Sequence, residues 1–120
     1  MKVTMWHNPR CSKSRQTLQL LQERGIEPEI VKYLETPPSA DEIREVLRLL
    51  GFSSARQLMR TKEKEYKELG LKDVDDEDRL IAAMVEHPRL IERPVVIVED
   101  EKGKRAALGR PPENVLALFE

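Results

Sequence analysis

Strand-forming stretches occur near the two ends of this chain, and a long helical stretch separates them. Near the start, Val3 and Met5 alternate with polar residues, and a second β-prone stretch covers residues 29–34. Near the end, residues 95–98 are Val-Val-Ile-Val, the most β-prone run in the chain. Without the helical middle, the expected order is therefore βαβ followed by ββα.

The first βαβ unit is defined by turn and cap signals. A strand over residues 2–6 leads into a loop at Asn8, and either Ser12 or Ser14 is suited to cap the helix that follows. Gly25 lies where a left-handed residue normally ends a helix. A crossover helix of this length favours a parallel pairing of the first two strands.

The C-terminal part has the pattern of a hairpin followed by a helix. A turn at residues 101–103 separates the run at 95–98 from a second short strand over residues 105–108. Either Pro111 or Pro112 is suited to begin a last helix. These elements complete a sheet of four strands with mixed directions.

The middle of the chain carries helix signals. Ser39 and Glu42 form a capping box for a helix that ends at Gly51. Residues 53–69 favour one or two more helices, and acidic residues open a further helix over residues 75–88. The sequence therefore predicts an α/β fold with a helical insertion.

Length and charge limit the kind of protein this is. The chain has 120 residues, which suits one domain over residues 1–120. Its 21 basic and 22 acidic residues give a net charge of -1, so we expect no general attraction to nucleic acid or to membranes. No apolar stretch approaches the roughly 18 to 20 residues of a membrane span. We therefore expect a cytoplasmic protein.

The chain contains one cysteine and therefore no internal disulfide. That composition suits a reducing compartment, and any redox cycle needs a thiol from another molecule. The single cysteine and the two histidines have no metal-ligand spacing, so no metal is predicted.

Cys11 lies at the junction between the first strand and its helix. Unpaired backbone N–H groups and the helix dipole stabilise a thiolate there, and they also attract an anionic substrate. No acidic residue precedes Glu23. Basic residues are frequent in the same stretch: Lys2, Arg10, Lys13 and Arg15. Cys11 is thus the predicted catalytic nucleophile, acting on a small oxyanion.

Two residues near Cys11 are candidates to stabilise its thiolate. Ser14 can donate a hydrogen bond to the thiolate, and a role as helix cap is compatible with that. His7 can act by charge or by hydrogen bond, although an exposed loop histidine is an equal alternative. Thr17 stands where phosphatase-type Cys-x5-Arg loops have arginine, so that mechanism is disfavoured.

The segment from His7 to Arg15, His-Asn-Pro-Arg-Cys-Ser-Lys-Ser-Arg, resembles the signature of glutaredoxin-dependent arsenate reductases. Later segments resemble other motifs of that family in the same order: Tyr33-Leu34, Pro37-Pro38, Leu58-Met59-Arg60, Lys62-Glu63, Tyr66, His87-Pro88, Arg93-Pro94 and Arg110-Pro111-Pro112-Glu113. The resemblance covers nearly the whole chain and points to the family's uncharacterised bacterial branch.

This resemblance implies a thioredoxin-like fold with the helical insertion at about residues 39–88. It also implies that Arg60, Arg93 and Arg110 bind the oxyanion beside the cysteine. The planar guanidinium suits that role because it offers paired donors and stays charged. Pro94 resembles the cis-proline that faces the active-site cysteine in such folds.

The resemblance further implies arsenate reduction to arsenite through a Cys11 adduct, with glutathione as co-substrate and glutaredoxin as partner. No bound cofactor is expected. Ser12-Lys13 differ from the Gly-Thr pair usual in that family, so a glutathione-linked thiol oxidoreductase with another substrate is an alternative. Spx-type transcription regulators share the fold and are a third, although their usual switch needs a cysteine where this chain has Ser14.

Overall fold

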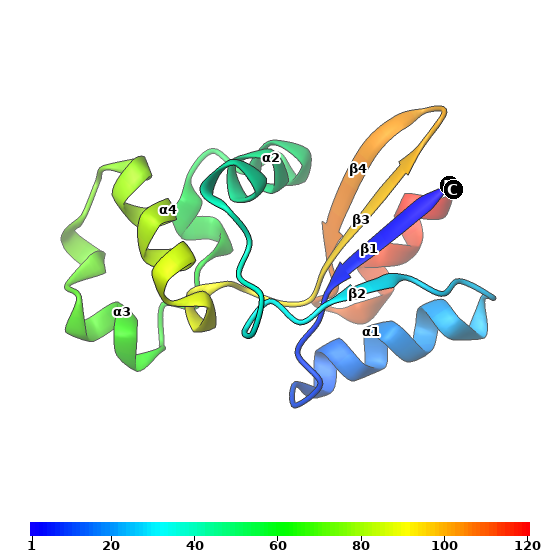
Figure 1. Ribbon diagram of the computed structural model, residues 1–120, viewed down its shortest axis with the longest axis horizontal. Coiled ribbons are helices and arrows are strands. Elements are labelled where there is room, and N and C mark those ends of the chain that lie inside the picture. Colours follow the sequence, from blue (N-terminus) through cyan, green and yellow to red (C-terminus); the bar gives the residue numbers. More distant parts are fainter. The chain divides into compact units, whose positions relative to one another are not determined.

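The computed structural model describes residues 1–120, which form two compact units. The first unit consists of Met1–Thr36 and Arg93–Glu120, and the second consists of Pro37–Glu92. All four strands of the sheet lie in the first unit, and Figure 1 labels the strands and α-helices of both.

The first unit is built on a four-stranded mixed sheet in the order β2-β1-β3-β4. β1 runs parallel to β2 and antiparallel to β3, and β3 and β4 form an antiparallel hairpin. The strands are β1 Lys2–Trp6, β2 Glu29–Val31, β3 Val95–Asp100 and β4 Gly103–Leu108. This arrangement of βαβ plus ββα confirms the α/β, thioredoxin-like fold expected from the sequence.

Two helices pack together over one face of this sheet: α1 (Ser12–Glu23) and the 3-10 helix η4 (Pro112–Phe119) (Figure 1). Their side chains meet those of β1 and β3 in one core. The core members are Val3, Met5, Leu21, Val96, Val98, Val115 and Leu118. Alternation along the strands and helical spacing in α1 place these apolar residues on the shared face.

The predicted serine cap of α1 is wrong. Cys11 occupies the N-cap position, with φ -92° and ψ 124°, and no side chain caps the helix. The Ser14 hydroxyl instead accepts the Asn8 backbone N–H at 3.0 Å and bonds to His7. The Ser14 hydroxyl is therefore used in contacts within the loop and does not cap α1.

β2 is shorter than the predicted strand over residues 29–34 and ends at Val31. The reason is a turn in which the Lys32 carbonyl accepts the N–H groups of both Glu35 and Thr36 at 2.9 Å. At the other end of the chain, the last helix begins at Pro112 and is of the 3-10 type. The Arg93–Pro94 peptide bond is cis as expected, and Arg110–Pro111 is cis as well.

The second unit is helical, and several of its boundaries match their sequence signals. Its elements are α2 Ala40–Leu50, η1 Ala55–Leu58, α3 Lys64–Glu68, η2 Leu71–Asp73, α4 Glu77–Glu86 and η3 Pro88–Leu90. The Ser39–Glu42 capping box is present, and Gly51 ends α2 with φ 73°.

None of the helices in either unit is both long enough and apolar enough to span a membrane.

A partly buried arginine joins the irregular segments of the second unit. The Arg56 guanidinium donates to the Tyr66 hydroxyl at 2.6 Å, to the Leu71 carbonyl at 2.9 Å and to the Val74 carbonyl. These acceptors come from α3 and from both ends of η2. Arg56 thus links η1 to chain segments that have few apolar side chains of their own.

Candidate active site

Cys11 lies at the end of the loop that follows β1 and directly before α1. The residue is 8% exposed and is therefore largely buried. The Cys11 N–H donates to the Asn8 carbonyl at 3.0 Å, which closes the loop into a tight turn. The first free N–H groups of α1 follow this residue directly.

Opposing influences act on the pKa of the Cys11 thiol, and the net result is a pKa below the ordinary 9.0. Burial is the largest influence and raises it, because a thiolate loses hydration. Hydrogen bonds from the backbone N–H groups of Ser14 and Lys13, together with the charge and a hydrogen bond of the Arg93 guanidinium, lower it. The thiolate is therefore stabilised by the helix N-terminus and by one arginine.

His7 and Ser14 form a buried pair behind this loop. The His7 Nδ1 and the Ser14 Oγ are 2.7 Å apart, and the two residues are 6% and 0% exposed. Burial lowers the pKa of His7, and the positive charges of Lys32 and Arg15 lower it further. The lowered pKa favours the neutral form of the ring, and the group of Ser14 that bonds to the thiolate is its backbone N–H.

Arg93 and Arg110 also belong to the first unit. Arg93 directly precedes the cis-proline Pro94, and the Nη1 of Arg110 donates to the Arg93 carbonyl at 3.3 Å. Gly109 lies in close contact with Pro94, since a Cβ added there would be 2.7 Å from the Pro94 Cγ and would overlap the Thr17 hydroxyl. The Arg93 guanidinium thus bonds to the Cys11 thiolate, and the Arg110 guanidinium bonds to the Arg93 carbonyl.

Arg60 belongs to the second unit, where its Nη1 forms an ion pair with the Glu63 Oε1 at 2.7 Å. Glu63 is only 15% exposed in its side chain, and its other oxygen lies 3.4 Å from the Arg89 Nη2. Binding of an oxyanion by Arg60 stays a prediction. No group of three or more His, Cys, Asp or Glu side chains is arranged to hold a metal ion.

A pocket of about 320 Å³ opens beside the Cys11 loop in the first unit. It is lined by the loop residues His7, Asn8, Pro9 and Arg10 and, after β2, by Lys32, Leu34 and Glu35. Lys32 and Glu35 are not among the residues predicted for the site. The parallel pairing of β1 with β2 could have indicated them, because the residues that follow two parallel strands lie at the same edge of the sheet.

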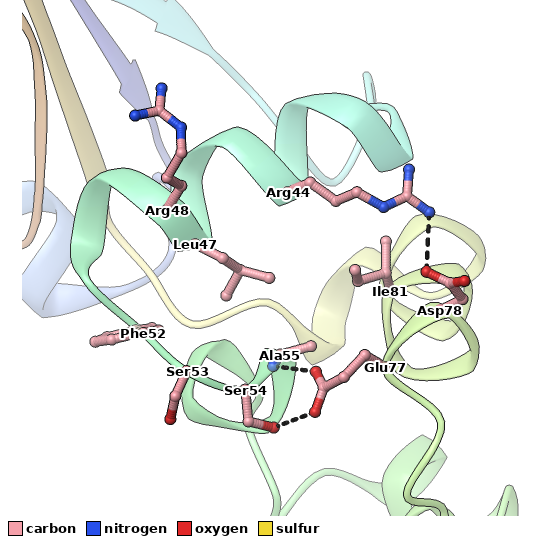
Figure 2. Close-up of a pocket in the computed structure, with 10 residues that line it drawn as sticks. All are labelled: Arg44, Leu47, Arg48, Phe52, Ser53, Ser54, Ala55, Glu77, Asp78 and Ile81. Carbon is pink, nitrogen blue, oxygen red and sulfur yellow. Dashed lines mark hydrogen bonds and ion pairs between the residues drawn. The ribbon is translucent and has the colours of Figure 1, made fainter.

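The second unit has a pocket of its own, of about 430 Å³, between α2, η1 and α4 (Figure 2). Leu47, Phe52 and Ile81 supply its apolar part. Three of its charged side chains have partners: Glu77 accepts from the Ser54 hydroxyl and the Ala55 N–H, and Asp78 pairs with Arg44 (Figure 2). None of the predicted site residues lines it.

The family match and similar known sequences indicate the same family. The model of the ArsC family matches residues 6–118. The chain is 54% identical to the uncharacterized protein YfgD of Escherichia coli, over 98% of this chain and 96% of that one. It is 49% identical to an arsenate reductase of Neisseria meningitidis, over 98% of both chains.

A solved structure agrees with these relatives. An arsenate reductase from Vibrio cholerae superimposes with a TM-score of 0.91 at 51% identity, covering 98% of this chain and 97% of that one. The family match over nearly the whole length, the relatives in sequence and this shared fold lead to one conclusion: this chain belongs to the ArsC family.

Proposed function

We propose that this protein is an arsenate reductase that uses Cys11 as its nucleophile, glutathione as its co-substrate and glutaredoxin as its partner. The observation that carries the proposal is the lowered pKa of the Cys11 thiol between the N-terminus of α1 and the Arg93 guanidinium. Relatives at about 50% identity that are named arsenate reductases support the choice of substrate.

In the first step, the Cys11 thiolate attacks the arsenic of arsenate. A sulfur–arsenic bond forms, and an arsenic–oxygen bond breaks with release of water once that oxygen is protonated. Arsenic stays pentavalent in this step. The charge on the remaining oxygens shifts during the exchange, and Arg60, Arg93 and Arg110 are the groups we assign to neutralise it.

In the second step, the thiolate of glutathione attacks the Cys11 sulfur. A sulfur–sulfur bond forms, and the electron pair of the sulfur–arsenic bond leaves with arsenic, which becomes trivalent arsenite. Both sulfur atoms are oxidised to the disulfide level. A thiolate of glutaredoxin then attacks the glutathione sulfur and releases Cys11 as a thiolate.

The need for an outside thiol follows from the cysteine count. Cys11 is the only cysteine, so the chain has no resolving thiol of its own. A glutathione-linked cycle requires a compartment in which thiols stay reduced, which supports a cytoplasmic location.

A different substrate is the second candidate, and Lys13 favours it. Lys13 follows Cys11 closely, and its N–H is among the groups that lower the pKa of the thiol. Its exposed cationic side chain changes the surroundings of the cysteine relative to the Gly-Thr pair usual in arsenate reductases. A glutathione-linked thiol oxidoreductase acting on another anion fits the same residues.

The test is arsenate reduction coupled to NADPH oxidation through glutathione, glutaredoxin and glutathione reductase. Cys11→Ser is expected to abolish turnover, and Arg93→Ala to lower kcat/KM by roughly 100-fold, since one donor to a developing oxyanion is worth about that much. Glu101→Gln, in the turn between β3 and β4, is the control variant. A folded native protein with a reduced thiol and no turnover would refute arsenate as substrate and leave the second candidate.

A further inference from the structure

We propose that the pocket beside the Cys11 loop is the binding site for glutathione. The inference rests on the proposed function, because it assigns a place to the co-substrate of that reaction. The pocket is lined by residues 7–10 and by Lys32, Leu34 and Glu35. It lies wholly within the first unit.

The location of the pocket follows from the pairing of β1 with β2. Trp6 pairs with Val31, and the His7 N–H continues the ladder to the Val31 carbonyl at 2.9 Å. The segments that follow the two strands leave the sheet after this point: the Cys11 loop follows β1, and the turn at Lys32 follows β2. The pocket forms where these two segments diverge.

The loop side of the pocket is held in a defined shape. The Asn8 Oδ1 accepts the Arg10 N–H at 3.0 Å, and the Pro9 carbonyl accepts from the Arg15 guanidinium at 3.0 Å. Behind them, Ser14 bonds to both His7 and the Asn8 N–H. A ligand therefore meets a wall that is already ordered, which reduces the entropy lost on binding.

The charges at the pocket match those of glutathione. Arg10 and Lys32 supply cations, Glu35 supplies a carboxylate, and no ion pair joins these side chains to one another or to other residues. Glutathione carries a carboxylate at each end and an ammonium group beside one of them. The two cations suit the carboxylates, and Glu35 suits the ammonium.

Size and polarity agree with a small peptide ligand. The volume of about 320 Å³ lies within the usual range for small-molecule sites, roughly 300–1,000 Å³. Leu34 is 38% exposed and offers an apolar surface between the charged groups. Arg10, which lines the pocket, directly precedes Cys11 in the chain, so the proposed site is next to the residue that the glutathione thiol must attack.

The experiment separates binding from turnover by using S-methylglutathione, which keeps the charges of glutathione and lacks a free thiol. Its Kd for the native protein is measured by calorimetry, and amide shifts in the NMR spectrum locate the site. We expect Lys32→Gln to weaken binding about fivefold and Lys32→Glu about 20-fold or more, from loss and then reversal of one charged contact. Lys102→Glu, in the turn between β3 and β4, is the matched control and is expected to leave the Kd unchanged.

The result that overturns the inference is an equal Kd in the native protein and in Lys32→Glu, or amide shifts confined to residues outside the pocket. Absence of any binding at millimolar S-methylglutathione overturns it too. In the arsenate assay, an unchanged KM for glutathione in Lys32→Glu would reject the pocket and keep the proposed function. Binding at the pocket by a protein that reduces no arsenate would reject the proposed function and keep the pocket.

Discussion

At the scale of single residues, Cys11 owes its reactivity to a balance of burial against charge. Burial raises the pKa of the thiol, and the backbone N–H groups of Ser14 and Lys13 with the Arg93 guanidinium more than offset it. A buried cysteine without such donors has a raised pKa and behaves as an unreactive apolar side chain. Removing one donor should therefore raise the pKa of the Cys11 thiol towards its ordinary value.

Arg93→Ala is expected to raise the pKa of Cys11, because the substitution removes both a charge and a hydrogen bond from the thiolate. The expected result is an alkylation by iodoacetamide that is several-fold slower at pH 7, roughly three- to tenfold. Following thiolate absorbance against pH gives the pKa directly. Arg24→Ala, at the opposite end of α1, is the control.

The same pKa difference has a consequence for stability. The folded pKa lies below the ordinary value of 9.0, so thiolate formation stabilises the folded protein fully above that value, and this contribution is lost as the pH falls through the folded pKa. In Cys11→Ser this dependence is absent. An identical pH dependence of stability in both proteins would contradict the lowered pKa.

At the scale of elements, Arg105 joins the β3–β4 hairpin to η4. Its guanidinium forms a paired contact with Asp100 at 2.9 and 3.0 Å and also donates to the Leu118 carbonyl at 2.8 Å. The hydrogen bond from Arg105 is the largest cause that lowers the pKa of Asp100, which falls from 3.8 to about 2. One arginine thus connects the hairpin to the C-terminal helix.

This contact predicts a specific loss of stability in acid. Asp100 has a folded pKa of about 2 against 3.8 unfolded, so its contribution is complete above about pH 4 and is lost as the pH falls towards 2. Asp100→Asn should unfold at a lower Tm than the native protein at pH 7, with the difference shrinking below pH 3. Thermal unfolding followed by circular dichroism measures this, and a difference that stays constant with pH would contradict it.

In the second unit, Arg56 performs a comparable linking role. Replacing it with Met leaves the Leu71 and Val74 carbonyls and the Tyr66 hydroxyl without their donor. We expect a loss of about 2–4 kcal/mol in the free energy of unfolding, against about 1 kcal/mol for Tyr66→Phe, which removes one hydrogen bond. Urea unfolding gives both values. Equal effects of the two substitutions would show that the carbonyl contacts contribute little.

At the scale of the whole molecule, the groups that tune Cys11 all belong to one unit. Ser14, Lys13 and Arg93 lie in the unit that contains the sheet, and Arg60 lies in the helical unit of Pro37–Glu92. The lowered pKa of the thiol and the proposed binding of the oxyanion are therefore separable. The lowered pKa involves groups of the sheet unit alone, whereas the role proposed for Arg60 in oxyanion binding involves a residue of the helical unit.

Replacing residues 37–92 with a glycine–serine linker tests that division. The sheet unit has its own core of strands and two helices, so we expect it to fold and to keep a lowered pKa at Cys11. Arsenate turnover should be lost. A folded variant with an ordinary thiol pKa would mean that the helical unit also acts on the thiolate, and Arg60→Ala in the full chain then identifies the part due to that arginine.

Prediction from sequence succeeded for helix caps and turns that have a distinct residue pattern. The Ser39–Glu42 capping box, the left-handed Gly51 and the hairpin turn after β3 are all present. It failed at the N-terminus of α1, where Ser14 bonds to His7 and Asn8 instead of capping the helix. The end of β2 was also misplaced, because a turn at Lys32 takes over the backbone donors.

The sequence by itself determined the strand and helix pattern and the location of Cys11 at the start of α1. These depend on periodicity, caps and turns within a few residues. Only the tertiary structure decided that Arg93 contacts the thiol, that His7 is buried with a lowered pKa, and that Lys32 and Glu35 share a pocket with the Cys11 loop. Those relations join residues far apart in the chain, and they exist because β1 pairs with β2 on one side and with β3 on the other.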